Sequence, residues 1–148
     1  MGQGAGPHLI AAFPLLAQTF CRLTSPATVD YNCIAWAAGD TERWWWPRPP
    51  YYWPAGARRD ESIDAFLEAY ATCGFSRCDS DRFEDGFVKI AIYAGHDGRV
   101  KHAARSVSAG RWTSKLGALE DIEHELEALS GPAYGNPAAF TRRHAASR

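Results

Sequence analysis

Residues 87–116 have the sequence FVKIAIYAGHDGRVKHAARSVSAGRWTSKL, and this stretch decides the fold. Its first third alternates in hydrophobicity, with Val88, Ile90 and Ile92 on one side. Alternation of this kind is typical of a β-strand with one buried face. The pattern therefore predicts a strand over residues 87–94.

Two turns follow that strand. The pair Asp97-Gly98 is a strong hairpin signal, so the chain is expected to return as a second strand over residues 100–107. Another glycine turn, at 109–110, leads into a third strand over 112–116. The stretch predicts an antiparallel meander of three or more strands.

Four segments outside the meander carry helix signals. Pro14 is expected to break or kink the first, and Gly39 to end the second. The tail from Tyr134 is expected to be loop or short helix. Helices followed by strands predict an α+β domain, in which a helix bearing Cys33 packs on a small antiparallel sheet and a helix lies near the C-terminus. The helices are expected over 8–20, Cys33–Ala38, 60–72 and 118–129.

The composition describes one domain over residues 1–148. Hydrophobic residues make up 46% and charged residues 22%, which favours a folded chain. The ends, 1–7 and 141–148, are expected to fray. Lys and Arg number 16 against 17 for Asp and Glu, so no basic surplus indicates a nucleic-acid partner.

Hydropathy and cysteine content bear on the compartment. The longest apolar stretch, 9–17, is about half of the ~20 residues that a membrane span needs, and no signal-peptide pattern is recognised. A cytoplasmic protein without membrane contact is predicted, in which the four cysteines stay reduced. Cys73 and Cys78 are too far apart for a CxxC motif, so neither a metal nor another cofactor is predicted.

Residues 43–57, RWWWPRPPYYWPAGA, combine prolines with aromatic side chains. The prolines exclude a regular helix or central strand, yet the aromatic content is not typical of a flexible linker. Three interpretations remain open: a flap that covers the core, a lid over a substrate, or a patch that contacts a protein partner. The aromatic residues are Trp44, Trp45, Trp46, Tyr51, Tyr52 and Trp53.

Cys33 is the candidate nucleophile. It begins its short helix, where the helix dipole and free N–H groups favour a thiolate and can hold an oxyanion. Asn32 precedes it and can cap the helix or supply a further donor. The alternative is a buried structural cysteine, which is a common fate of free cysteines.

His102, on the second strand of the meander, is the candidate base. A thiol enzyme needs a histidine in reach of the sulfur and a third group that orients its ring, here Ser114. Alternation does not settle which face meets His102, and a polar strand residue is the alternative. Lys115 either points into the site as an oxyanion or carboxylate partner or lies exposed. His124 either orients a site residue or belongs to a charged helix face.

The motifs YNCIAWA (31–37), HAAR (102–105) and WTSKLG (112–117) resemble a family of small uncharacterised bacterial proteins, a domain of unknown function. More distantly, the chain resembles papain-like cysteine hydrolases of the NlpC/P60 type. That resemblance implies a papain-like fold, although the Trp/Pro-rich stretch and the missing Asp before the cysteine depart from it. The implied catalytic residues are Cys33, His102 and Ser114, supported by Asn32, Trp36, Trp112 and Lys115.

Three functions compete. The first is a cysteine-dependent hydrolase or acyl transferase, of peptidase, amidase or deamidase type, acting on a peptide or protein. The second is a non-catalytic interaction module, adaptor-like or immunity-like, that contacts a protein through the aromatic loop. The third is a metal-binding module built on Cys73 and Cys78. The first is preferred on sequence.

Overall fold

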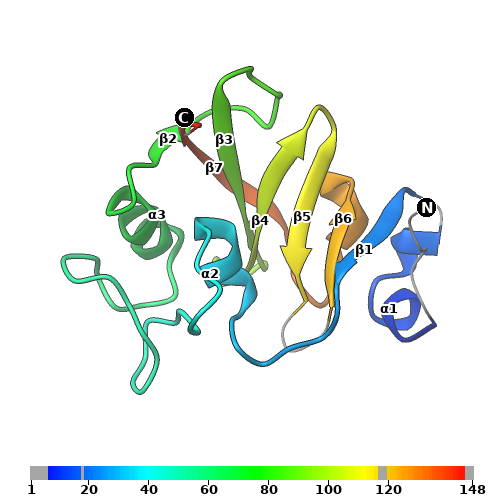
Figure 1. Cartoon of the computed structure of the whole chain (residues 1–148). Coiled ribbons are helices and arrows are strands. Elements are labelled where there is room, and N and C mark those ends of the chain that lie inside the picture. The colour runs from blue at the N-terminus through cyan, green and yellow to red at the C-terminus, as the bar shows by residue number, and fades with distance from the viewer. Residues whose placement is uncertain (1–6, 18, 117–119, 146–148) are drawn as a thin grey trace.

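The structure is a computed structural model, and it describes residues 7–17, 19–116 and 120–145. These residues form an α+β domain with one large antiparallel sheet and a few short helices (Figure 1). In chain order the elements are α1 (Pro7–Ala12), the 3₁₀ helix η1 (Pro14–Ala17), β1 (Cys21–Ser25), α2 (Cys33–Ala38), α3 (Ile63–Ala71), β2 (Ser76–Cys78), β3 (Phe87–Ala94), β4 (Val100–Ser108), β5 (Arg111–Lys115), β6 (Asp121–His124), the 3₁₀ helix η2 (Leu126–Leu129) and β7 (Asn136–His144).

The predicted meander is confirmed as β3, β4 and β5, but the sheet is larger than predicted. In the described residues it has seven strands in the order β1-β6-β5-β4-β3-β7-β2, and all neighbours are antiparallel. β1 and β6 extend the meander at one edge. At the other edge the last strand, β7, inserts between β3 and β2. Both edges therefore come from segments outside the stretch that predicted the sheet.

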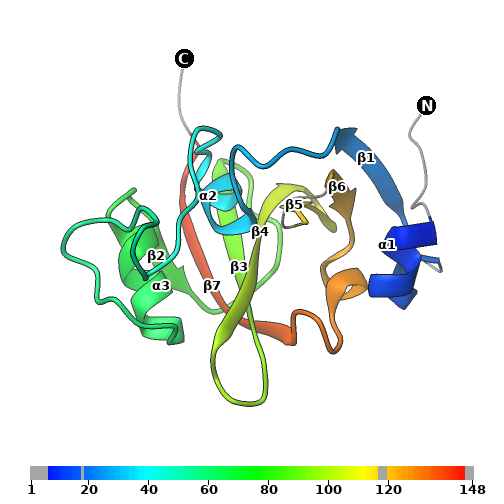
Figure 2. The same ribbon diagram turned by 90° about the horizontal axis from the view of Figure 1, so that it is seen from below.

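The sheet separates two hydrophobic cores. On one face Ile90, Ile92 and Ala103 pack with α2, α3 and the aromatic loop. On the other face Ala91 and Tyr93 pack with α1, η1 and η2. Figures 1 and 2 show α2 and η2 on opposite sides of the sheet. Which face a strand residue occupies therefore decides which core it joins.

The central helices agree with the sequence. α2 begins at Cys33 and ends at Gly39, whose positive φ of 90° suits the residue that ends a helix. α3 lies inside the predicted 60–72 helix and begins after the N-cap Ser62. The first predicted helix is divided at Pro14 into α1 and η1. β1 and β2 were not predicted.

The helix predicted over 118–129 is wrong for its described part. Residues 117–119 lie outside the described residues, Asp121–His124 is strand β6, and η2 follows. All four residues of β6 are buried. A strand that is buried on both faces has no exposed polar side, so its sequence lacks the alternation that marks a half-buried strand. Its polar side chains have partners elsewhere in the fold: Tyr31 donates to Asp121, and Arg22 pairs with Glu123. Tertiary contacts outweigh the local helical spacing here.

The tail predicted as loop or short helix, with a frayed end from 141, instead contains β7. Residues Asn136–His144 pair with β3 along its whole length, and part of the strand also pairs with β2. Arg142 forms an ion pair with Glu84, and the Arg143 guanidinium lies 4.5 Å from the Phe75 ring centroid. These contacts hold Arg142 and Arg143 in the segment that was expected to fray.

No helix within the described ranges is long and apolar enough to cross a membrane. Among the same residues, no group of three or more His, Cys, Asp or Glu side chains is placed to hold a metal ion. Cys73 Sγ lies 3.9 Å from Thr72 Oγ1, and Cys78 Sγ is 3.8 Å from the Ser80 carbonyl. The two cysteines on which the metal hypothesis rested thus have separate neighbours.

Candidate functional site

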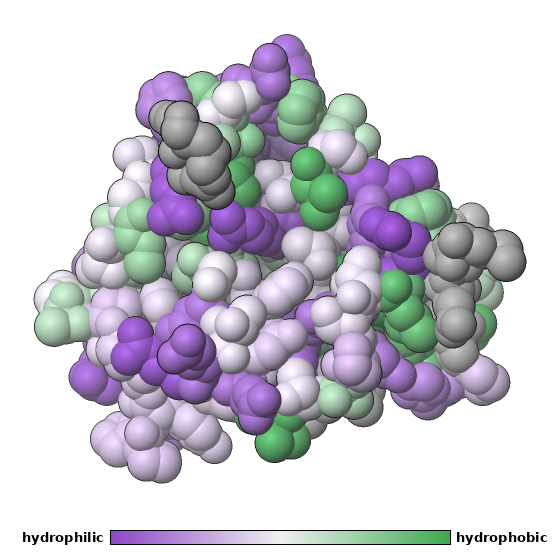
Figure 3. All heavy atoms as spheres, viewed as in Figure 1, coloured by the Kyte–Doolittle hydropathy of each residue, from purple (hydrophilic) through white to green (hydrophobic). Residues whose placement is uncertain are grey.

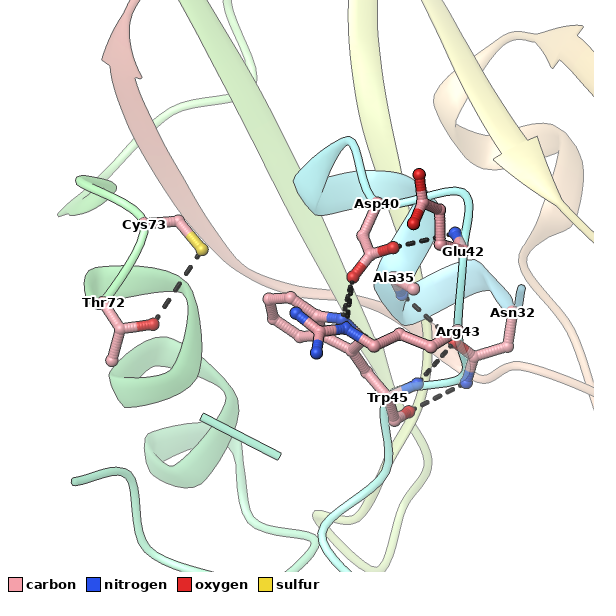
Figure 4. A network of polar contacts seen from close by, with 8 residues as sticks. All are labelled: Asn32, Ala35, Asp40, Glu42, Arg43, Trp45, Thr72 and Cys73. Atoms are coloured by element: carbon pink, nitrogen blue, oxygen red, sulfur yellow. Dashed lines mark hydrogen bonds and ion pairs between the residues drawn. The ribbon is translucent and has the colours of Figure 1, made fainter. Parts of the chain in front are cut away.

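Asn32 connects the start of α2 to the aromatic loop. Its Oδ1 accepts hydrogen bonds from Ala35 N and from Trp45 N, both 3.1 Å away. Its Nδ2 donates to Trp45 O at 2.8 Å. Figure 4 shows this network, in which Asp40 also accepts from Trp45 Nε1. The predicted capping role of Asn32 is confirmed, and the same side chain anchors the loop beside Cys33.

Cys33 lies in an apolar environment at the first position of α2. Only 8% of its surface is exposed, within the core formed by α2, α3 and the aromatic loop. Burial raises the pKa of the Cys33 thiol to about 11, although backbone hydrogen bonds from Ala103 and Ile34 act in the opposite direction. At neutral pH the sulfur therefore carries its proton.

His102, Ser114 and His124 form a hydrogen-bonded chain across three neighbouring strands. Ser114 Oγ lies 2.9 Å from His102 Nε2 and 2.7 Å from His124 Nε2. His124 Nδ1 lies 2.7 Å from the Glu125 carbonyl, so this nitrogen is the donor. With His124 neutral, its Nε2 accepts from Ser114, and Ser114 in turn accepts from His102 Nε2–H. His102 Nδ1 is then a bare acceptor, and it has no hydrogen-bond partner within the ranges that the structure describes.

Burial keeps both histidines uncharged. It lowers the pKa of His102 well below its usual value, and the neighbouring His124 lowers it further. Burial also lowers the pKa of His124, to about 4. Ser114, His102 and His124 are all fully buried. The chain they form is closed to solvent at neutral pH.

No hydrogen bond joins Cys33 and His102 among the described residues. His102 pairs with Tyr93 across the β3–β4 ladder, so both side chains lie on the face that carries η2. Ala103 is the β4 residue in the core with Cys33. Neither ring nitrogen of His102 hydrogen-bonds to the sulfur, because Nε2 binds Ser114 and Nδ1 has no partner. The structure thus joins His102 to Ser114 but not to Cys33.

Lys115 is buried on the same face as α2. Its Nζ donates to Thr28 O at 2.7 Å and lies 5.4 Å from the centroid of the Tyr31 ring. Burial lowers the pKa of Lys115, while Asp121 and Cys33 act to raise it. The alternative of an exposed lysine is wrong. The ammonium supports the loop that precedes Asn32.

The two supporting tryptophans lie on different faces. Trp36 Nε1 donates to Thr113 Oγ1 at 3.3 Å, and its ring stacks on Tyr31 at 5.5 Å. Trp112 is buried in the opposite core, beside Phe140. Trp36 thus links α2 to β5. Trp112 lies on the other face of the sheet, in the core that η2 covers.

A pocket of about 310 Å³ opens beside Cys33. Four aromatic residues dominate its lining, and a single lysine and a single asparagine contribute polar groups. Trp44 Nε1 donates to Val29 O at 2.6 Å, and the Trp44 ring stacks on Tyr51. The lining residues are Asn32, Cys33, Trp44, Trp46, Tyr51, Lys101 and Tyr134.

The aromatic loop divides between two roles. Trp45 and Trp53 are each only 3% exposed and pack in the core, against Tyr70 and Phe66 respectively. The pocket residues of the same loop are less buried, and Tyr51 is 45% exposed. The loop thus covers the core with some tryptophans and presents others around Cys33.

Tyr134 connects the pocket with the histidine chain. Its ring stacks on His102 with centroids 4.0 Å apart and planes 3° apart, and it also lines the pocket. Sequence reasoning missed Tyr134 because it lies in a tail without a motif. It also missed Lys101, which could have been found as the charged neighbour of His102. His124 was considered, but on a helix face rather than on a strand.

Three larger depressions lie away from this site. One of about 670 Å³ borders the β3–β4 turn at His96, one of about 710 Å³ lies beside Phe83, and one of about 450 Å³ lies beside Arg59. None of the three includes Cys33, His102 or Ser114. Figure 3 shows strongly hydrophobic residues as separate spots on the α2 side of the molecule, without a broad patch. The pocket at Cys33 is where aromatic surface and a candidate reactive group coincide.

Fold and site define an α+β domain with a seven-stranded antiparallel sheet and an aromatic pocket at the start of a cysteine-bearing helix. The family model described as "Domain of unknown function (DUF7689)" matches residues 22–142, so the chain belongs to this family. The predicted membership in such a family is confirmed. Neither the curated proteins nor the solved structures contain a significant match to the chain.

Proposed function

We propose that this domain is a non-catalytic binding module that receives an apolar group in the pocket beside Cys33. The observation that carries the proposal is the lining itself, in which Trp44, Trp46, Tyr51 and Tyr134 surround one small cavity. Pockets lined mainly by aromatic side chains with few polar groups are typical of binding sites. Tryptophan and tyrosine also dominate the binding energy of protein interfaces.

The pocket walls are held in place before anything binds. Trp44 is fixed by its hydrogen bond to Val29 O, and Trp46 packs edge-on against Phe66 with centroids 5.5 Å apart. Asn32 holds the intervening Trp45 through two backbone contacts. A preorganised pocket loses little conformational freedom on binding, which favours affinity.

The state of the thiol favours binding over catalysis. A nucleophilic cysteine needs a lowered pKa or a base in reach of its sulfur. The pKa of Cys33 is raised to about 11, and His102 lies on the other face of the sheet. The Cys33 thiol then contributes a small apolar surface to the pocket.

A neutral aromatic probe tests the binding role. N-acetyl-phenylalaninamide, titrated against the protein and followed by amide NMR, is expected to shift the resonances of Cys33, Trp44 and Lys101. Tyr51→Ala should weaken this binding, whereas Phe83→Ala should not. Tyr51 and Phe83 are matched, since they are 45% and 44% exposed, and only Tyr51 lines the pocket. Absence of shifts at the solubility limit of the probe would overturn the proposal.

The second candidate is the cysteine hydrolase or acyl transferase of papain-like type. It is favoured by the backbone hydrogen bonds from Ala103 and Ile34 to the sulfur, which would stabilise a thiolate or an oxyanion. In this mechanism the sulfur attacks a carbonyl carbon while a base takes the thiol proton. The bond to the leaving group then breaks, the leaving group takes up that proton, and water or another acceptor releases the acyl group from the thioester and restores the thiol. His102 Nδ1 has the free lone pair for that step, but it would have to turn out of its stack on Tyr134.

Alkylation kinetics separate the two candidates. The rate of Cys33 labelling by iodoacetamide, measured against pH by mass spectrometry, should follow an apparent pKa near 11 if Cys33 only lines a pocket. His102→Ala should leave that value unchanged. An apparent pKa below the ~8.5 of a free thiol that rises in His102→Ala would favour the hydrolase instead.

A further inference from the structure

Lys101 carries the one charge among the described residues that line the pocket. Its side chain is 39% exposed, and its Nζ lies 3.6 Å from Asp97 Oδ2, across the β3–β4 turn. Asp97 is 53% exposed and also accepts a hydrogen bond from Arg99 N. An ion pair this long and this exposed is weak. Lys101 therefore keeps most of its capacity to attract an anion.

The other polar groups of the pocket differ in whether they already form hydrogen bonds. All the hydrogen bonds that the Asn32 side chain forms hold Ala35 and Trp45. Within the described residues, Trp46 Nε1 and the hydroxyl of Tyr51 take part in no hydrogen bond, and both residues line the pocket. An ammonium, an indole N–H and a phenol supply more donors than acceptors. The pocket thus matches an apolar group that carries acceptor oxygens.

The size of the pocket indicates how much of a partner enters it. A cavity of about 310 Å³ lies at the small end of the range of ligand sites, where one large side chain fills the space. Around it, Arg48, Pro49, Pro50 and Tyr51 are exposed and leave a surface on which a backbone can lie. This combination suits an anchor side chain that projects from a longer segment.

We infer that the pocket takes a protein segment in which an aromatic side chain is followed by an acidic residue, the ring lying among Trp44, Trp46 and Tyr51 and the carboxylate on Lys101. This inference rests on the proposed binding function and names its partner. Charge complementarity at Lys101 selects the acidic neighbour. The aromatic walls select the ring, through offset or edge-to-face contacts.

Capped tetrapeptides provide the probe. Acetyl-Gly-Phe-Glu-Gly-amide, its Phe-Gln analogue and its Ala-Glu analogue differ only in the carboxylate or the ring. Binding is followed by the intrinsic fluorescence of the protein, because Trp44 and Trp46 line the pocket and the peptides contain no tryptophan. At low salt the Phe-Glu peptide should bind about three- to fivefold tighter than Phe-Gln, as expected for one partly exposed ion pair. The Ala-Glu peptide should not bind.

Two variants test the role of Lys101. Lys101→Met should remove the difference between Phe-Glu and Phe-Gln, measured as the ratio of the two dissociation constants within the variant. Asp97→Asn should increase the difference, because it removes the competing carboxylate and keeps an acceptor for Arg99 N. Added salt should reduce the preference for Phe-Glu towards one.

The outcomes separate this inference from the proposed function. Equal binding of Phe-Glu and Phe-Gln would overturn the acidic partner and leave the aromatic pocket intact. Failure of all three peptides, together with failure of N-acetyl-phenylalaninamide, would overturn the binding function itself. Tighter binding of phenylacetate than of the Phe-Glu peptide would assign the pocket to small aromatic acids and overturn the protein partner.

Discussion

The two faces of the sheet bury polar groups in different ways. On the α2 face, Cys33 and Lys101 border a pocket, and Lys115 lies behind them. On the η2 face, His102, Ser114 and His124 form a buried hydrogen-bonded chain that leaves only His102 Nδ1 unpaired among the described residues of the chain. The difference arises from one position in β4, because Ala103 faces α2 and His102 does not. A shift of one residue in a strand moves a side chain from one core to the other.

The largest expected effect is on the closed face. Ser114→Val removes the hydroxyl that serves both histidines and leaves two buried ring nitrogens without partners. Each unpaired buried group costs about 1–3 kcal/mol, so the free energy of unfolding should fall by about 2–6 kcal/mol. Urea denaturation measures it. Ser108→Val, at an exposed position of β4, is the control and should change stability by less than about 0.5 kcal/mol. Similar losses in both variants would argue against a structural histidine chain.

The same face should make stability depend on pH. The folded-state pKa of His124 is about 4, below the ~6.5 of an unfolded histidine. The unfolded chain therefore binds more protons once the pH falls below ~6.5, and stability decreases from there towards pH 4. One such histidine contributes a loss of about 3 kcal/mol over this window. His102, whose pKa is also lowered by burial, acts in the same direction.

Urea denaturation between pH 7 and pH 4.5 checks this dependence. His124→Gln cannot be protonated, so its stability should change less steeply with pH than that of the parent chain. Whatever His124→Gln costs at neutral pH cancels in the comparison of slopes. Parallel slopes would show that His124 is not kept neutral by the fold.

The sequence predicted the local elements better than their partners. Alternation at 87–94 and the glycine at 98 define the β3–β4 hairpin, and the cap Asn32 with Gly39 defines α2. These signals lie within a few residues of the structures they specify. β6 and β7 have no such signal, because their burial and pairing depend on segments far along the chain. Long-range pairing is what a single sequence does not display.

The sequence singled out part of the candidate site, but neither Tyr134 and Lys101 nor the geometry of the site. Cys33 and His102 have the helix-start and strand positions that suggested a catalytic pair. Their separation by the sheet follows from strand register, which hydrophobicity could not determine because β4 is buried on both faces at its centre. The pocket could not be predicted either, because its lining brings Tyr134 from the tail together with Trp44 and Trp46 of the aromatic loop.

On the pocket face, Asn32→Ala should have an intermediate effect. It removes a helix cap and two contacts with Trp45, at a cost of about 1–3 kcal/mol in unfolding free energy. Ser62→Ala removes the cap of α3 together with an exposed hydrogen bond to Asp60, and should cost about 1 kcal/mol. N-acetyl-phenylalaninamide should bind more weakly to Asn32→Ala, since Trp45, which lies between Trp44 and Trp46 in the chain, loses its anchor. It should bind normally to Ser62→Ala. Equal binding by both variants would show that Asn32 does not organise the pocket.

Cys33→Ala should have the smallest effect and divides the two interpretations of this face most directly. The sulfur borders a pocket, so its loss enlarges an existing space rather than opening a new cavity. The free energy of unfolding should therefore fall by only about 1 kcal/mol. Binding of N-acetyl-phenylalaninamide, followed by NMR, should stay within about twofold, because the aromatic walls remain and one small apolar contact is lost. Ser114→Val, on the opposite face, serves as the comparison for stability. If Cys33→Ala folds and binds normally and no reaction is lost, Cys33 is part of the pocket wall. If binding is intact but a thiol-dependent reaction of the parent chain is lost, Cys33 is the nucleophile.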